Sequence, residues 1–169
     1  MGNGNVINYS SPIQVGSLNT WSRVACGWSH VIALKTDGTL WGWGRCDKGQ
    51  LGNGVTTGNG YSSPIQIGSL NTWKLIVATE YSSAGVSDHY KTDLYGGLWG
   101  WGSNQYGELG LGDTAHRSSP VQVPGSWSVV ANGTVQTFHN VAIRTDGTLW
   151  AWGDNTYGQL GTNDPGINY

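Results

Sequence analysis

The stretch that decides the fold is Lys35-Thr36-Asp37-Gly38-Thr39-Leu40-Trp41-Gly42-Trp43-Gly44. It recurs as Lys91-Thr-Asp-Leu-Tyr-Gly-Gly-Leu-Trp-Gly-Trp-Gly102 and again as Arg144-Thr-Asp-Gly-Thr-Leu-Trp-Ala-Trp-Gly153. Self-similarity at this scale indicates one supersecondary unit per repeat, and each unit needs neighbours to bury its faces. The sequence therefore predicts a repeat fold.

Two shorter motifs flank every copy. A Gly-(Gln/Glu)-Leu-Gly clasp follows it at 49–52, 107–110 and 158–161, and Ser-Ser-Pro-(Ile/Val)-Gln precedes it at 10–14, 62–66 and 118–122. Successive prolines of the second motif lie 52 and 56 residues apart. We expect one repeat domain over residues 1–169, with repeats at about 10–61, 62–117 and 118–169. Residues 1–9 form an N-terminal connector, and 161–169 resemble a second version of it.

Short extended runs bounded by turn residues predict the strands of each repeat. In the first repeat these runs are Ile13–Val15, Trp21–Cys26, His30–Lys35 and Thr39–Trp43. Asp37-Gly38 predicts a tight hairpin between the last two, because such a turn needs the positive φ that glycine supplies cheaply. Four strands in each repeat of about 50 residues, without helical periodicity, are typical of a β-propeller with one four-stranded sheet per blade.

The fold class predicted is therefore all-β, with three four-stranded antiparallel blades that form part of a propeller. Each repeat carries a pair of tryptophans separated by one small residue. Gly or Ala between the indoles lets blades approach closely, and the indoles fill the gaps between blades. We expect these residues to be packing residues: Trp41, Trp43, Trp99, Trp101, Trp150 and Trp152.

These motifs resemble the regulator of chromosome condensation repeat family. The resemblance is carried by Val24 to Gly27 with His30, by Thr36 to Gly44 and by Gly49 to Gly52, and it covers nearly the whole chain. The residues of the tryptophan motif resemble those of the bacterial and phage branch of this family. The family spans a Ran nucleotide exchange factor, a plant ultraviolet-B photoreceptor, bacterial β-lactamase inhibitors and uncharacterised phage proteins. The resemblance thus implies the fold and leaves the function open.

The family usually closes a ring of seven blades within one chain, which three blades cannot do. An open stack exposes one apolar blade face at each end, on the order of several hundred Å² each, which soluble monomers avoid. Two chains arranged head to tail give six blades, a size that propellers use. We expect a head-to-tail homo-oligomer or a larger protein assembly.

Composition argues against several classes of partner. Only 11% of residues are charged and the net charge is -2, so no basic stripe is available to bind nucleic acid. No apolar run approaches the roughly 18 residues of a membrane span. The N-terminus lacks a basic and apolar leader, so we expect cytoplasmic synthesis.

Catalytic, cofactor and metal motifs are also missing from the sequence. Asp37, Asp93 and Asp146 recur in turns, and Glu80 and Glu108 are the only glutamates, with nothing to pair them. We expect no enzyme activity, no cofactor and no metal.

The cysteines and two of the histidines are expected to be structural. Cys26 and Cys46 occur in one repeat only, which favours free thiols over a bridge. His30 and His139 precede equivalent apolar runs, so we expect structural residues that form hydrogen bonds.

The repeats differ most in the connector before the third predicted strand, which is longer in the second and third repeats. Insertions in repeat folds map to exposed loops on one face. Four aromatic residues of the connectors are candidate partner-binding residues that could form one surface: Trp28, Tyr81, Tyr90 and Phe138. Tyr81, Tyr90 and Phe138 are predicted to lie on one face and to be more exposed than the repeat tryptophans. Such a surface suits protein or glycan contact. Unconstrained drift in loop sequence is the alternative explanation.

Two functions follow from these observations. The first is a structural subunit that assembles through protein–protein contacts, for example as a decoration or tail component of a phage virion. The alternative is a binding or inhibitor module that recognises a protein or glycan through one propeller face. Low charge and a unit that closes only by assembling favour the first.

Overall fold

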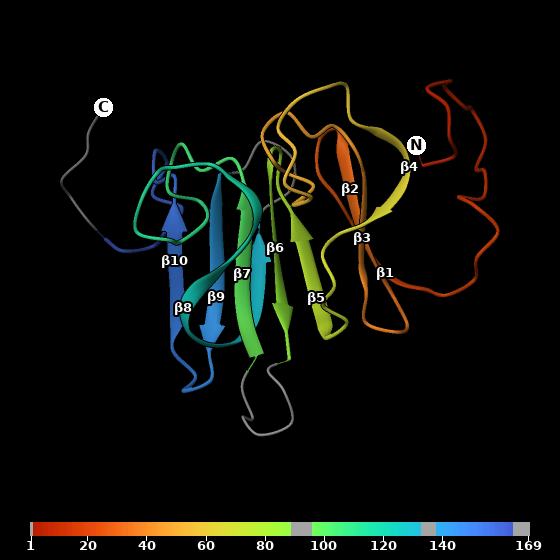
Figure 1. Ribbon diagram of the computed structural model, residues 1–169. Helices are drawn as coiled ribbons and strands as arrows, with labels where there is room; N and C mark the ends of the chain where they lie inside the picture. Colours follow the sequence, from red (N-terminus) through yellow and green to blue (C-terminus); the bar gives the residue numbers. More distant parts are fainter. Residues whose placement is uncertain (1, 89–95, 133–137, 164–169) are drawn as a thin grey trace.

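The computed structural model describes residues 2–88, 96–132 and 138–163, and over these ranges the chain forms ten β-strands and no helix (Figure 1). The all-β class is therefore confirmed. The strands are β1 Trp21–Cys26, β2 His30–Lys35, β3 Leu40–Gly44, β4 Tyr61–Gln66, β5 Trp73–Ala78, β6 Ser82–Ser87, β7 Gly96–Gly102, β8 Arg117–Asn132, β9 His139–Arg144 and β10 Leu149–Gly153.

The strands form a row of three antiparallel blades. Blade 1 is the four-stranded sheet β1-β2-β3-β4, and a second sheet has the order β10-β9-β8-β7-β6-β5. The long strand β8 serves two blades, because its first part pairs with β7 and its second part, from Trp127, pairs with β9. Blade 2 is thus β5, β6, β7 and the first part of β8, and blade 3 is the rest of β8 with β9 and β10.

The structure corrects the predicted position of one strand. Ile13–Val15 forms no strand, and its counterpart Tyr61–Gln66 pairs with β3 of the blade before it. The Ser-Ser-Pro segment therefore completes the preceding blade instead of opening its own repeat. The first copy has no preceding blade to pair with in this chain, and blade 3 has three strands within the described residues instead of the expected four.

The predicted Asp-Gly hairpins are present in blades 1 and 3. Asp37 Oδ1 accepts hydrogen bonds from the backbone N–H and hydroxyl of Thr39, at 3.0 and 2.6 Å, and Gly38 has a φ of 80°. The Thr39 hydroxyl bond lowers the pKa of the Asp37 carboxyl. Asp146 and Thr148 repeat the arrangement. The aspartate therefore fixes the turn, as the sequence predicts. The second repeat's substitute for this turn, at 93–97, lies largely outside the described residues.

The hydrophobic core is divided into two layers, each lying between neighbouring blades. Ile32, Leu34 and Leu40 of blade 1 pack against Trp73 and Trp101 of blade 2. Between blades 2 and 3, Val86 and Leu98 pack with Trp127 and Val130, and Trp152 borders the cluster. Trp99, Trp101 and Trp152 therefore pack between blades, as predicted. Trp41 and Trp43 instead pack against Trp21 of their own blade, and Trp150 is exposed.

His30 links blades 1 and 2 across the first layer. Its Nε2 lies 2.9 Å from Ser83 Oγ, and the ring is buried. Burial lowers the pKa of His30 to about 4, so the imidazole is neutral in the folded protein. The structural role predicted for His30 is confirmed. Cys26, which is exposed, and Cys46, which is buried, are free thiols as predicted.

We predict that the free energy of unfolding decreases on acidification from pH 6.5 to about 4. In this window the unfolded chain binds a proton at residue 30 and the folded chain does not, so stability is lost as the pH falls. The full effect is roughly 3 kcal/mol, measurable by urea unfolding at a series of pH values. His30→Asn should flatten this slope, because asparagine has no group that titrates in this pH range. An unchanged slope in His30→Asn would contradict the assignment.

Candidate protein-interaction site

The junctions inside the chain show what a blade face requires of its neighbour. At each junction a backbone carbonyl of the preceding blade's clasp accepts the indole N–H of the second tryptophan of the next blade. Trp101 Nε1 lies 3.0 Å from the Gln50 oxygen, and Trp152 Nε1 lies 2.9 Å from the Glu108 oxygen. Each carbonyl also accepts a second donor, from Ser83 Oγ at the first junction. At the second junction that donor is Asn140 Nδ2, at 2.6 Å.

The last glycine of the first and second clasps lies close against the same indole. A Cβ on Gly52 would lie 2.9 Å from Trp101 Nε1, and one on Gly110 would lie 2.8 Å from Trp152 Nε1. Both glycines have positive φ, of 74° and 71°. Only glycine satisfies the conformation and the close approach together. Two residues further along, the Gly54 N–H donates to the Ser118 carbonyl, which ties the connector to the fourth strand of blade 2.

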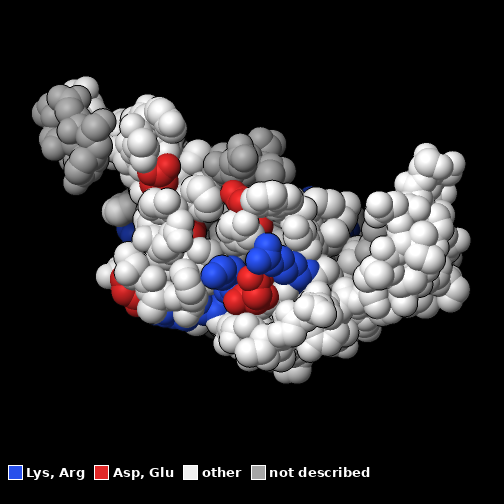
Figure 2. Space-filling view, turned by 90° about the horizontal axis from the view of Figure 1, so that it is seen from above, with Lys and Arg blue, Asp and Glu red and all other residues white. Residues whose placement is uncertain are grey.

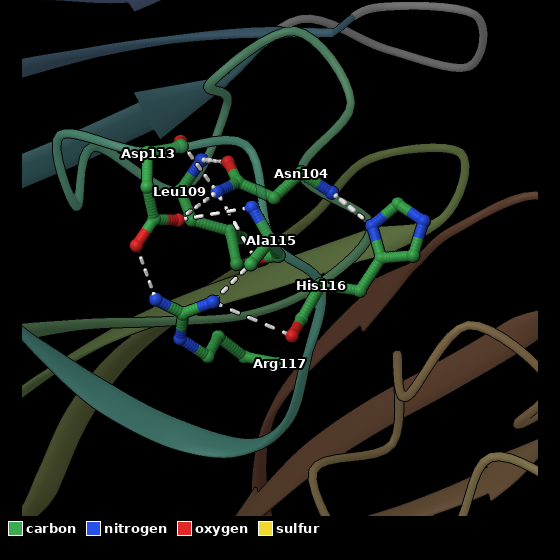
Figure 3. Close-up of polar contacts among 6 residues, drawn as sticks. All are labelled: Asn104, Leu109, Asp113, Ala115, His116 and Arg117. Carbon is green, nitrogen blue, oxygen red and sulfur yellow. Dashed lines mark hydrogen bonds and ion pairs between the residues drawn. The ribbon is translucent and has the colours of Figure 1, made fainter.

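A buried asparagine holds the connector between β7 and β8 in place (Figure 3). The Asn104 side chain donates to the Asp113 and Ala115 carbonyls, at 2.8 and 3.2 Å, and accepts the Leu109 N–H at 2.8 Å. Its backbone N–H donates to His116 Nδ1 at 2.9 Å. Asp113 accepts the Ala115 N–H and pairs with Arg117, and both contacts lower the pKa of its carboxyl. The connector is therefore fixed mainly by neutral hydrogen bonds.

The outer face of blade 1 carries a fragment of the same arrangement. A Cβ on Gly2 would lie 2.9 Å from Trp43 Nε1, and the Gly4 N–H donates to the Ser62 carbonyl at 2.8 Å. Residues 2–4 thus lie on blade 1 as residues 52–54 lie on blade 2. Beside them is an open hollow of about 430 Å³, lined mainly by apolar groups of Val15, Trp21, Arg23, Val24, Ala33 and Trp43.

Equivalent positions show how much of each end face is uncovered. Leu40 and Leu98 are 0% exposed at their junctions, whereas Leu149 is 70% exposed on the outer face of blade 3. Likewise Ile76 and Val130 are 6% and 3% exposed, whereas Val24 is 66% exposed on blade 1. Residues that are buried at internal junctions are therefore exposed at both ends of the row.

The backbone edge of blade 3 is open as well. The equivalent strands β3 and β7 each pair with a Ser-Ser-Pro strand on this side, whereas β10 pairs only with β9 among the described residues. In Figure 1, β10 lies at one end of the row and the N-terminal segment that includes residues 10–14 lies at the other. Sequence reasoning missed these interface residues individually. Alignment of the three repeats with the strands in their observed phase would have found them.

The candidate partner-binding aromatics lie where neighbouring blades meet. Trp28 contacts Tyr81, with ring centres 5.8 Å apart, and Phe138 contacts Tyr106, with ring centres 5.0 Å apart. Tyr90 lies outside the described residues. Trp28 is 55% exposed, but Tyr81 and Phe138 are half-buried, as are Trp41 and Trp152. Tyr81 and Phe138 are thus more exposed than Trp43 and Trp101, as expected, but less exposed than Trp150. Their exposure is limited because each contacts a ring from the adjacent blade.

The connectors between β1 and β2 and between β5 and β6 lie on the side of the row where β6 and β9 begin (Figure 1). Figure 2, which views this side, shows basic and acidic side chains grouped near its middle, with mostly uncharged surface around them. Arg45 pairs with Asp47 at 2.7 Å, and its guanidinium lies 5.6 Å from the Tyr81 ring centre. The side therefore offers Trp28, Tyr81 and Arg45 together.

Within the described ranges no group of three or more His, Cys, Asp or Glu residues is placed to hold a metal ion. The same part of the chain contains no helix long and apolar enough to cross a membrane.

Comparison with known proteins agrees with this geometry. A profile of the Regulator of chromosome condensation (RCC1) repeat matches residues 1–34, 37–86 and 95–137, and a second profile of the same description matches 21–50 and 137–159. The chain belongs to the regulator of chromosome condensation repeat family. Its fold is that of a partial RCC1-type β-propeller, as predicted, and repeats of this type are protein-interaction modules.

Two relatives with similar sequences are much longer than this chain. The Ultraviolet-B receptor UVR8 of Arabidopsis thaliana is 35% identical over 170 residues, which cover 97% of this chain and 37% of the receptor. The probable E3 ubiquitin-protein ligase HERC3 of Homo sapiens is 32% identical, with 88% of this chain and 14% of that protein covered. The chain thus spans less than two fifths of either relative.

Solved structures support the fold. Prp20p of Saccharomyces cerevisiae superposes with a TM-score of 0.73 at 23% identity, over 87% of this chain and 36% of that one. Human WBSCR16 gives a TM-score of 0.71 at 22% identity, over 86% and 36%. Prp20p is described as binding Gsp1p and histones.

We predict that Gly52→Ala destabilises the folded chain more than Gly161→Ala. Both glycines have positive φ, so alanine costs roughly 1 kcal/mol at either position. Only at Gly52 does the new methyl meet an indole, whereas nothing lies within 4 Å at Gly161. Overpacking of this kind adds about 1–3 kcal/mol. Urea unfolding of the two variants measures the difference, and equal losses would show that the clasp contact does not stabilise the junction.

Proposed function

We propose that this chain is a non-catalytic structural subunit that assembles head to tail through the outer faces of blades 1 and 3. The observation that carries the proposal is the exposure of Leu149 and Val24, whose counterparts are buried at both internal junctions. Full burial of one aliphatic side chain contributes about 1.5–3 kcal/mol. The outer face of blade 3 is equivalent to the face with which blade 1 contacts blade 2 and to the face with which blade 2 contacts blade 3. Its best-fitting partner is therefore the outer face of blade 1 in a second copy.

The proposed setting is a particle built from many copies, such as a phage virion in which the chain is a decoration or tail component. The chain would be synthesised in the cytoplasm and incorporated into the particle. Support comes from the similarity of the tryptophan motif to bacterial and phage repeats and from the low content of charged residues. Two chains in a closed ring give the smallest assembly without an open face.

A second candidate function uses the connector side instead of the ends. Trp28, Tyr81 and Arg45 lie together there, next to an open hollow of about 650 Å³ that Arg45, Asp47 and Tyr61 line. Exposed tryptophan beside arginine is typical of binding hot spots for protein or glycan ligands. A ligand retained by an assembly-deficient variant such as Leu149→Lys, but not by Trp28→Ser, would support this function.

We predict that the wild-type chain sediments at micromolar concentration as a species larger than its 18.0 kDa monomer. Leu149→Lys and Val24→Lys should each abolish this association, because each places a charge on a face that a partner blade covers. Thr114→Lys, in the exposed connector after β7, adds the same charge away from both end faces and should leave association unchanged. A folded wild-type monomer at this concentration would contradict the proposal.

Mixing the two monomeric variants tests the head-to-tail arrangement. Val24→Lys keeps its blade 3 face and Leu149→Lys keeps its blade 1 face, so the mixture should form a dimer with one intact junction. If like faces associated with each other, one of the variants would dimerise alone and the mixture would add nothing.

A further inference from the structure

We infer that the open edge of β10 receives the segment Tyr9–Gln14 of a second copy as a fourth, antiparallel strand. This inference rests on the proposed head-to-tail assembly and names the segment that joins the copies. Blades 1 and 2 are each completed by a Ser-Ser-Pro strand, and in blade 3 the edge of β10 has no such strand within the described residues. The third Ser-Ser-Pro segment of the chain, at 10–12, forms no strand within its own copy.

The register follows from the two pairings that the chain already contains. In blade 1, Trp41 pairs with Gln66, Gly42 with Ile65 and Gly44 with Tyr61. In blade 2, Trp99 pairs with Gln122, Gly100 with Val121 and Gly102 with Arg117. The same positions in blade 3 and in the N-terminal segment give Trp150 opposite Gln14, Ala151 opposite Ile13, and Gly153 opposite Tyr9.

The N-terminal segment already lies where this pairing needs it. Ile67, which follows β4, is buried against blade 2 in the cluster that contains Trp73 and Trp101. Val15 occupies the same position relative to blade 1, where it lines the hollow with Trp21 and Trp43. Blade 1 therefore presents residues 9–14 beside its outer face as the last strand of a missing blade, and blade 3 of a second copy supplies the remaining three strands.

One substitution at the new junction fits its partner. Blades 1 and 2 have glycine between the paired tryptophans, and a Cβ on Gly42 would lie 2.8 Å from Ile67 Cδ1. Blade 3 has Ala151 at this position, and the residue after Gln14 is Val15, which has no δ-carbon. Val15 therefore leaves room for the methyl group of Ala151, as the equivalent Val123 does beside Gly100 in blade 2, where the close neighbour of the glycine is Leu109. The alternative occupant of this edge, a segment of an unrelated protein, is excluded only by the cross-link described next.

A disulfide between copies tests the pairing and its register. Ile13→Cys and Ala151→Cys are made in separate chains that also carry Cys26→Ser, since Cys26 is exposed and Cys46 is buried. Directly opposite residues in an antiparallel pair have Cα atoms about 4.5–5.5 Å apart, within disulfide reach. Mild oxidation of the mixture should give a cross-linked dimer that neither chain gives alone.

The matched control is Ser11→Cys, mixed with Ala151→Cys in the same background. Residue 11 lies two positions from residue 13 along the strand and therefore about 8 Å from residue 151 across the pair, beyond disulfide range. We expect about tenfold less dimer from this mixture. A yield equal to that of Ile13→Cys would overturn the proposed register.

Sedimentation of the unmodified chain separates failure of this inference from failure of the proposed function. Association without the Ile13–Ala151 cross-link overturns strand addition and leaves assembly through the blade faces intact. If the chain stays monomeric and no cross-link forms, both proposals are wrong.

Discussion

Burial of one blade face against the next is the constraint on which the whole structure depends. A four-stranded blade is too thin to have an interior of its own, so its two apolar faces are covered only by neighbours. The clasp carbonyl that accepts the Trp101 or Trp152 indole N–H fixes how the next blade is placed, because a buried indole donor needs an acceptor at one position. The small residues between the tryptophans follow from the same requirement.

This dependence explains which features the sequence predicts. The Asp37-Gly38 turn, the tryptophan pairs and the clasp glycines recur because each blade has the same local contacts, so the propeller fold is recognisable from repetition alone. The assignment of each strand to a blade, in contrast, cannot be predicted from the repeats alone. Ser62 to Gln66 reads as the start of its own repeat, and only pairing with β3 shows that it completes the previous blade. Long-range strand pairing leaves no local signal in the sequence, and so the repeat pattern predicts a strand at Ile13–Val15 that blade 1 does not contain.

The connector aromatics show the same limit at the level of side chains. An aromatic residue in an inserted loop suggests a binding surface, and Trp28 is indeed exposed. Tyr81 and Phe138, however, stack on rings that the neighbouring blade contributes, which reduces their exposure. Conversely, Leu149 and Val24 look like ordinary core residues in the sequence. They become candidate interface residues only because blade 1 and blade 3 are the ends of the row.

The contacts at a junction between copies would not equal those inside the chain. Ser83 and Asn140 give each internal clasp carbonyl a second donor, but Val31 holds that position in blade 1 and cannot donate through its side chain. Residues 2–4 also occupy the surface of Trp43 that residues 161–163 of a neighbour would need. Residues 161–163 of a neighbour could bind there only by displacing residues 2–4. Because one set of contacts would replace a similar set, this exchange would contribute little free energy to association. Association between copies would therefore depend on the apolar face around Leu149 and on the backbone edge of β10, which no other strand of the described residues covers.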